Sequence, residues 1–175
     1  MNAALLYHAK IMIVDDELMN VRLLEKLLTR EGYLNISMTT DSRDALAMFQ
    51  DDQPDLILLD LNMPHINGYE VMQSLAALIS SSSFLPIIVL TADVTPEAKQ
   101  RALAAGAADF ICKPFDNVEV TLRIRNVLRI RFLQRQLETQ AMVMEERVRE
   151  RTEFLQRTVI ELQKVQQQVL QQEAV

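Results

Sequence analysis

The sequence predicts an α/β fold in which a doubly wound, five-stranded parallel sheet precedes a long C-terminal helix. Over the first two thirds of the chain, short apolar runs alternate with longer amphipathic segments. The third and fourth runs are apolar enough to be covered on both faces, as the strands of a parallel sheet are. From Val118 to about Gln172 the chain has no proline or glycine, which indicates one uninterrupted helix.

The five predicted strands are, in order, KIMIV, NISM, DLILL, PIIVL and ADFIC. The four segments between them carry apolar residues at helical spacing and cover residues 18–30, 42–50, 69–78 and 96–105. A run of four serines at 80–83 interrupts the pattern and is interpreted as a polar loop. Because parallel neighbours need a crossover connection, strands that alternate with helices predict a doubly wound sheet.

Local signals support these boundaries. Gly32 and Gly106 each follow a helical segment, where a residue in the left-handed conformation often ends a helix. Either Asp41 or Ser42 is expected to cap the second helix. Thr95 is expected to cap the fourth, which has a proline at a tolerated first-turn position.

The composition indicates one globular domain with an appended part. The chain has 175 residues, of which 49% are hydrophobic, and a formal net charge of -6. This acidic balance argues against a general nucleic-acid-binding surface. The residues through Arg123 include 9 basic and 17 acidic side chains, whereas those from Ile124 onward include 9 basic and 7 acidic. The two parts are therefore expected to be separate units.

The sequence indicates a cytoplasmic protein. Its single cysteine, Cys112, has no intramolecular disulfide partner, which suits a reducing compartment. No apolar run approaches the roughly 18 residues of a membrane span, and the first ten residues are too weakly apolar for a secretory signal.

Acidic residues and one lysine stand at the predicted strand ends. Asp15 and Asp16 close the first strand, Asp60 closes the third, and Lys113 follows the fifth. The carboxyl ends of parallel strands face the crevice where ligands bind, so these side chains are expected to converge. Crowded carboxylates repel unless positive charge lies among them, and a divalent cation with Lys113 would supply it. A carboxylate left partly free would then be able to attack phosphorus.

Over roughly residues 9–125 the chain resembles the receiver domain of two-component response regulators, of the chemotaxis type with a flavodoxin-like fold. The resemblance rests on the acidic pair after strand one and on Asp60 followed by Met-Pro and Asn-Gly. It rests equally on Thr91-Ala92 after strand four and on Lys-Pro-Phe after strand five.

The resemblance implies a role for each matching residue. Asp60 matches the aspartate that accepts a phosphoryl group from a histidine kinase or phosphotransfer protein. Asp15, Asp16 and Asp60, with the backbone carbonyl of Asn62, match the ligands of Mg²⁺. Lys113 matches the lysine that pairs with a phosphoryl oxygen and with Asp60.

The resemblance also implies a conformational switch. Thr91 would bond the phosphoryl group as its loop moves inward, and Phe110 matches the aromatic residue that changes rotamer during that movement. A phenylalanine has no hydroxyl group, so such a switch would act by packing. The bond between Lys113 and Pro114 is expected to be cis.

Each residue also has a plainer interpretation. Phe110 would be a core residue, and His65 is expected to be a solvated loop histidine. The other plain roles are helix caps for Asp15 and Asp16, a turn former for Asp60, a strand-end hydroxyl for Thr91 and a solvated lysine for Lys113.

The C-terminal segment, residues 126–175, carries a heptad pattern. The a positions are Val127, Gln134, Ala141, Val148, Leu155, Leu162 and Val169, and the d positions are Ile130, Leu137, Met144, Arg151, Thr158, Val165 and Gln172. Ten of these fourteen residues are apolar, which favours a coiled coil and a parallel homodimer. The alternative is a glutamine-rich, partly frayed tail.

Other features of this segment leave its output open. Its basic stretch, Arg123 to Arg135, is interrupted by apolar residues, so nucleic-acid binding is not expected. The segment EERVRERTEFL looks like the helices that link receivers to output domains, including HD-GYP cyclic-di-GMP phosphodiesterase domains. The chain is then either part of a longer regulator or a phosphoacceptor whose coiled coil is the output. A different possibility is a docking and dimerisation module in which the coiled coil is the working part.

Overall fold

The computed structural model describes residues 6–79, 84–93 and 95–173, except for the side chains of 169–173. The predicted serine loop at 80–83 lies outside the described residues. The side chains of Val169 and Gln172 also lie outside the described residues. They are the last a and d positions of the predicted coiled-coil seam, the stripe formed by the a and d residues of the heptad pattern.

The five predicted strands form one parallel sheet in the order β2-β1-β3-β4-β5. This confirms the expected flavodoxin-like arrangement. Every residue of β3 and β4 is buried, as their continuous apolar sequence predicts. The strands are β1 (Lys10–Val14), β2 (Asn35–Thr39), β3 (Leu56–Asp60), β4 (Ile87–Thr91) and β5 (Asp109–Cys112).

The helices also follow the predicted order: α2 (Leu18–Arg30), α3 (Ala45–Asp52), α4 (Gly68–Leu78), α5 (Pro96–Ala104) and α6 (Asn117–Glu173). The second predicted helix begins as a short 3₁₀ turn, η1 (Ser42–Asp44), before α3. Asp41 caps that turn by accepting a hydrogen bond from the Arg43 N–H, and Thr95 caps α5 as expected. Gly32 and Gly106 have φ angles of 98° and 102°, which confirms their left-handed conformation.

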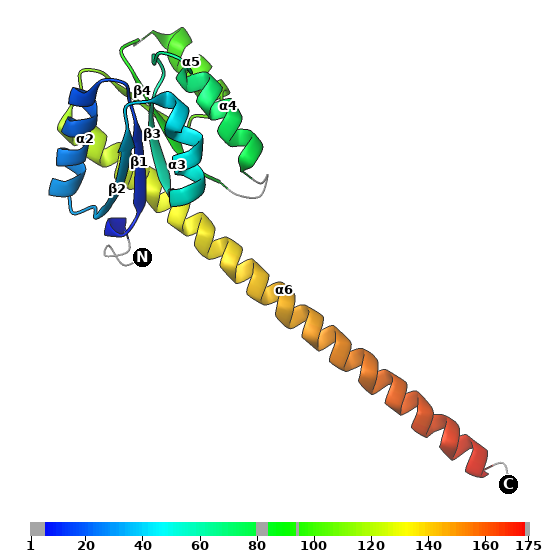
Figure 1. Cartoon of the computed structure of the whole chain (residues 1–175). Coiled ribbons are helices and arrows are strands. Elements are labelled where there is room, and N and C mark those ends of the chain that lie inside the picture. Colours follow the sequence, from blue (N-terminus) through cyan, green and yellow to red (C-terminus); the bar gives the residue numbers. More distant parts are fainter. Residues whose placement is uncertain (1–5, 80–83, 94, 174–175) are drawn as a thin grey trace. The chain divides into compact units, whose positions relative to one another are not determined.

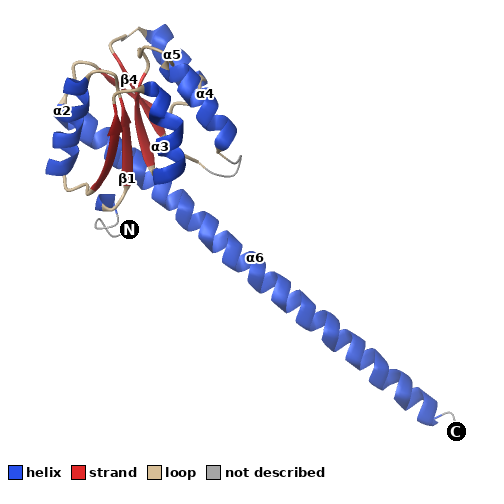
Figure 2. Cartoon of the chain, viewed as in Figure 1, coloured by secondary structure: helices blue, strands red, loops and turns tan. Residues whose placement is uncertain are grey.

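Alternate residues of the strands face two separate cores. Ile11 and Ile13 of β1 pack with α2 and the first turns of α6, whereas Met12 and Val14 pack with α3, α4 and α5. The helices therefore cover both faces of the sheet, as Figures 1 and 2 show. Because successive side chains of a strand point to opposite faces of the sheet, each face has its own apolar core and its own layer of helices. The ends of the strands lie between the two helix layers and are available to form a site.

The chain divides into two compact units, residues 1–133 and 134–175. Helix α6 contributes to both. Val127, the first predicted seam position, is only 7% exposed because it packs in the core of the first unit, whereas Ile130 is 52% exposed. The seam that remains available therefore begins at Ile130. None of the described helices is long and apolar enough to cross a membrane.

Candidate functional site

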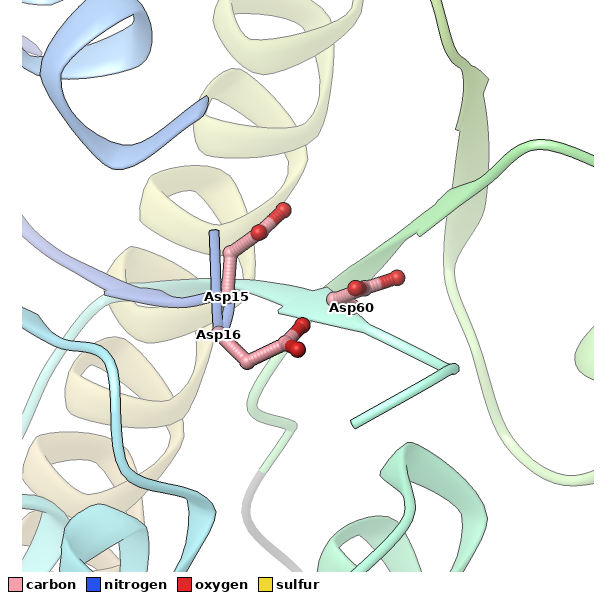
Figure 3. Close-up of side chains that lie close together, drawn as sticks. All are labelled: Asp15, Asp16 and Asp60. Atoms are coloured by element: carbon pink, nitrogen blue, oxygen red, sulfur yellow. The ribbon is translucent and has the colours of Figure 1, made fainter. Parts of the chain in front are cut away.

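Three carboxylates gather at the carboxyl ends of β1 and β3. Asp15, Asp16 and Asp60 each offer an oxygen, and these atoms lie within 4.8 Å of one another. Figure 3 shows the three side chains leaving neighbouring strand ends. Asp15 is fully buried and Asp60 is 3% exposed. An all-oxygen donor set of this kind suits a hard cation such as Mg²⁺.

Lys113 brings the one ammonium group that contacts this cluster among the described ion pairs. Its Nζ lies 2.8 Å from Asp15 Oδ2 and 3.0 Å from Asp60 Oδ2. Its backbone N–H donates to the carbonyl of Thr91 at 2.7 Å, and the Lys113–Pro114 bond is cis, as expected. Three formal negative charges and one positive charge leave a balance of -2, which matches one divalent cation.

The environment of Lys113 favours its charged form. Burial by itself lowers the pKa of the ammonium group. The hydrogen bonds and charges of Asp15 and Asp60 act in the opposite direction, and they raise the pKa of Lys113 above its ordinary value. The interpretation of Lys113 as a freely solvated lysine is therefore wrong, since its side chain is 17% exposed and doubly ion-paired.

Asp15 is held by two further donors at the start of α2. The backbone N–H of Glu17 donates to Asp15 Oδ1 at 2.9 Å, and Asn20 Nδ2 donates to both carboxylate oxygens at 3.1 and 3.2 Å. Glu17 is the N-cap residue, so Asp15 supports the helix start while also facing Lys113. Asn20 was not among the predicted site residues. The available signal was an amide side chain within the first turn after the acidic pair.

Asp60 is followed by a loop that returns tightly to its own strand. The backbone N–H of Asn62 donates to Asp60 Oδ1 at 3.3 Å, and the Gly68 N–H donates to the carbonyl of Leu61 at 3.0 Å. Asn67 caps α4 in a reciprocal arrangement with Glu70. The residues after the phosphoacceptor candidate are thus tied down at both ends, and Asn62 itself is exposed.

Thr91 lies at the end of β4, beside the cluster. It is 4% exposed, and its hydroxyl oxygen accepts a hydrogen bond from the Asp93 N–H at 3.0 Å. A cavity of about 270 Å³ opens here, lined by Leu61, Asn62, Tyr69, Thr91, Asp93, Glu97, Ala98 and Arg101. The hydroxyl group therefore stands at a cavity that also reaches the residues after Asp60.

Phe110 lies on β5 and is half-buried against the core beneath α3, α4 and α5. Lys99 Nζ of α5 lies 4.8 Å from the ring centroid, and Arg123 Cζ of α6 lies 5.3 Å from it. Arg123 is in turn paired with Asp109 and Glu119, each at 2.7 Å. The ring is thus a partly exposed aromatic in contact with two cations, which differs from an ordinary core phenylalanine.

Comparison with known proteins matches residues 11–125 to the response regulator receiver domain family. A "Probable transcriptional regulator ycf27" of Porphyridium aerugineum is 42% identical over 120 residues, which cover 69% of this chain and 48% of the relative. "Response regulator PleD" of Caulobacter vibrioides is 38% identical over 125 residues, covering 71% of this chain and 27% of PleD. The match therefore spans less than half of the length of these two relatives.

Solved structures similar to this chain are also response regulators or chemotaxis proteins. The chemotaxis protein CheY4 of Vibrio cholerae is 32% identical, with a TM-score of 0.63, and the alignment covers 69% of this chain and 98% of CheY4. A response regulator from Chloroflexus aurantiacus is 30% identical with a TM-score of 0.64, over 70% of this chain and 98% of that chain.

Proposed function

Because this chain belongs to the response regulator receiver domain family, we propose that Asp60 accepts a phosphoryl group from a phosphohistidine of a histidine kinase or phosphotransfer protein. One observation carries the proposal. The Asp60 carboxylate is buried at a strand end, 3.0 Å from Lys113 Nζ, and it shares a cluster with Asp15 and Asp16. A capping or turn-forming aspartate would need neither the lysine nor the two other carboxylates.

The proposed reaction uses an Asp60 oxygen as the nucleophile. A P–O bond forms at that oxygen as the P–N bond of the phosphohistidine breaks, and the electron pair returns to the imidazole nitrogen. Oδ2 of Asp60 is ion-paired with Lys113 Nζ at 3.0 Å, whereas Oδ1 of Asp60 accepts a longer hydrogen bond of 3.3 Å from the Asn62 N–H. Oδ1 is therefore the more weakly held oxygen. Lys113, which is ion-paired with Asp60, is proposed to pair with an oxygen of the incoming group.

Mg²⁺ is the cation proposed for this donor set, which supplies only oxygen ligands. Asp15, Asp16, Asp60 and the backbone carbonyl of Asn62 are the proposed ligands. When bound, the ion would offset the charge of the carboxylates and of the transferring phosphoryl group. The formal charge of -2 at the cluster supports a divalent cation over a monovalent one.

Thr91 and Phe110 are the proposed switch residues. In the present state the Thr91 hydroxyl oxygen is bonded to the Asp93 N–H. Turning this hydroxyl toward a phosphoryl group would release that bond and draw the loop after β4 inward. Phe110, which contacts Lys99 and Arg123, would then change rotamer into the space that the loop vacates. The phosphoryl group must interact better with that state for it to become populated.

Helix α6 is proposed to carry the signal onward as a parallel homodimeric coiled coil. In this scheme residues 9–125 are the receiver and residues 126–175 the signalling helix. Leu137, Met144, Val148, Leu155 and Leu162 are 55–64% exposed, and they recur at heptad spacing. Burying such a stripe against a second copy removes it from water. The alternative, a docking module whose coiled coil is the working part, draws on the same stripe.

The phosphoacceptor is tested with a small phosphodonor. Asp60→Asn is expected to abolish Mg²⁺-dependent phosphoryl uptake measured by intact mass, while Asp51→Asn on α3 leaves uptake unchanged. Uptake by Asp60→Asn equal to that of the parent would refute the site. A parent protein that folds normally but takes up no phosphoryl group would favour the docking alternative.

The proposed transmission of the signal through α6 is tested by measuring the molecular mass of the protein in solution by light scattering. The measurement is made with Mg²⁺, before and after addition of beryllofluoride as a phosphoryl mimic. A change from monomer to dimer would mean that the receiver controls pairing of α6. A constant dimer would mean that α6 pairs constitutively and that any signal travels as a change in helix geometry. A constant monomer would contradict the homodimer.

A further inference from the structure

The loop after Asp60 contains a strained turn. The Ile66 N–H donates to the carbonyl of Pro64 at 2.9 Å, which closes a three-residue turn around His65. His65 has a φ angle of 70°, in the left-handed region that a residue with a side chain rarely adopts. A γ-turn with positive φ is rare and strained, and such strain persists only where the surroundings impose it.

Ser42 contacts both polar atoms that close this turn. Its hydroxyl donates to the Pro64 carbonyl at 2.9 Å, and its oxygen accepts from the Ile66 N–H at 3.2 Å. One serine hydroxyl can make both bonds, since it carries one donor and two acceptor lone pairs. Ser42 belongs to η1 and is 3% exposed, so water competes poorly for these bonds.

We infer that Ser42 is a positioning residue for the metal-binding loop, held through the turn at Pro64 to Ile66. The inference rests on the proposed function, because the loop that it positions carries Asn62, a proposed Mg²⁺ ligand. Asn62 is only two residues from Pro64. The Gly68 N–H ties the end of the segment to Leu61, the residue after β3, and Ser42 supplies the hydrogen bonds in its middle.

Loss of the Ser42 hydroxyl leaves the turn with its single internal hydrogen bond and an unfavourable φ at His65. The turn is then expected to open more often, and the Asn62 carbonyl to lose its fixed direction. Mg²⁺ requires near-octahedral geometry, so its affinity is sensitive to a displaced ligand. Residues that orient ligands typically change metal affinity by about tenfold or more.

The test compares Ser42→Ala with Ser42→Thr, which retains the hydroxyl, and with Ser74→Ala. The last is a matched control, because Ser74 Oγ donates to the Glu70 carbonyl within α4. Mg²⁺ affinity is measured by amide NMR titration. Amide hydrogen exchange of Ile66 and Leu59 is measured in the metal-free protein, which requires no bound ion.

Ser42→Ala is expected to weaken Mg²⁺ binding about tenfold. Exchange at Ile66 should accelerate by a similar factor while that at Leu59 changes little. Ser42→Thr and Ser74→Ala should remain close to the parent. Parent-like Mg²⁺ affinity in Ser42→Ala, or equal acceleration at Ile66 and Leu59, would overturn the inference. If the parent itself binds no Mg²⁺, the metal part of the proposed function fails, and Ile66 exchange alone decides whether Ser42 holds the loop.

Discussion

A Cβ atom on Gly68 would lie 2.3 Å from the backbone oxygen of Asp60. Such a separation does not occur for real side chains, so the first residue of α4 has to be a glycine for the helix to begin against the end of β3. The same contact explains why a glycine stands eight residues after Asp60, the phosphoacceptor candidate.

Gly68→Ala is expected to push α4 away from β3 and to destabilise the fold by about 3 kcal/mol, at the upper end of overpacking costs. Mg²⁺ affinity should fall as well, because the displaced backbone carries Asp60. Gly106→Ala is the control, since its Cβ would meet nothing within 4 Å and only its φ of 102° is unfavourable. Urea unfolding and Mg²⁺ titration measure the two effects, and equal Mg²⁺ affinity in both variants would contradict this account.

Lys113→Met is expected to lower the free energy of unfolding by about 3 kcal/mol in Mg²⁺-free buffer, because it leaves buried carboxylates without their cation. Lys26→Met on α2 serves as the control for loss of a lysine. Urea denaturation at neutral pH measures both. A parent-like stability of Lys113→Met would mean that the ion pairs of Lys113 with Asp15 and Asp60 contribute nothing net.

The stability difference between the parent and Lys113→Met should shrink as the pH rises above 10.5. The pKa of Lys113 is raised in the folded protein above the ordinary 10.5, so the unfolded chain releases this proton first. Its contribution is therefore complete below pH 10.5 and is lost as the pH rises through the folded pKa. Burial also raises the pKa of Tyr33 to about 12, but Tyr33 is present in both proteins and its effect cancels in the difference. A difference that grows above pH 10.5 in urea titrations would reverse this assignment.

Lys99→Met should favour the active state of the receiver. The contact of Lys99 with the Phe110 ring is worth about 0.5–1 kcal/mol, and its loss would ease the rotamer change by roughly two- to fivefold. The expected result is that Lys99→Met binds beryllofluoride more tightly than the parent does in the presence of Mg²⁺. An amide NMR titration measures this binding. In a Phe110→Leu background the same lysine substitution should have no effect. Weaker binding in Lys99→Met would argue against the switch.

Leu155→Ala should weaken pairing of α6 more than tenfold, since a buried Leu→Ala change costs about 2 kcal/mol or more. Ile160 is the matched control, because it is similarly exposed, at 52% against 55%, but it lies on the opposite side of the heptad from the seam. Light-scattering mass over a range of concentrations measures both. If Ile160→Ala dissociates the dimer and Leu155→Ala does not, the seam register is wrong.

Much of the site could be predicted from the charged residues at the carboxyl ends of the predicted strands. Asp15, Asp16, Asp60 and Lys113 were expected to converge because parallel strands present their carboxyl ends at one edge, and the distances in the cluster agree with that expectation. Thr91 also lies at a strand end, beside the same edge. The ligand and switch roles of these residues remain predictions.

The residues that support the site from remote segments were not predictable in the same way. Asn20 is only five residues from Asp15, but Ser42 hydrogen-bonds the turn at His65 from a segment more than twenty residues earlier. Phe110 was predicted as a switch, but its contacts with Lys99 and Arg123 come from two different helices. The contacts of Ser42 and Phe110 depend on the exact approach of packed elements.

The sequence by itself determined the order of strands and helices, the bounds of α2, the cap at Thr95 and the set of charged strand ends, because periodicity and capping act over a few neighbouring residues. Only the tertiary structure decided that Lys113 bonds Asp15 as well as Asp60, that Gly68 meets the Asp60 backbone, and that Val127 is buried in the first unit rather than left on the seam. These outcomes depend on distances between segments remote in the chain, and close packing sets those distances.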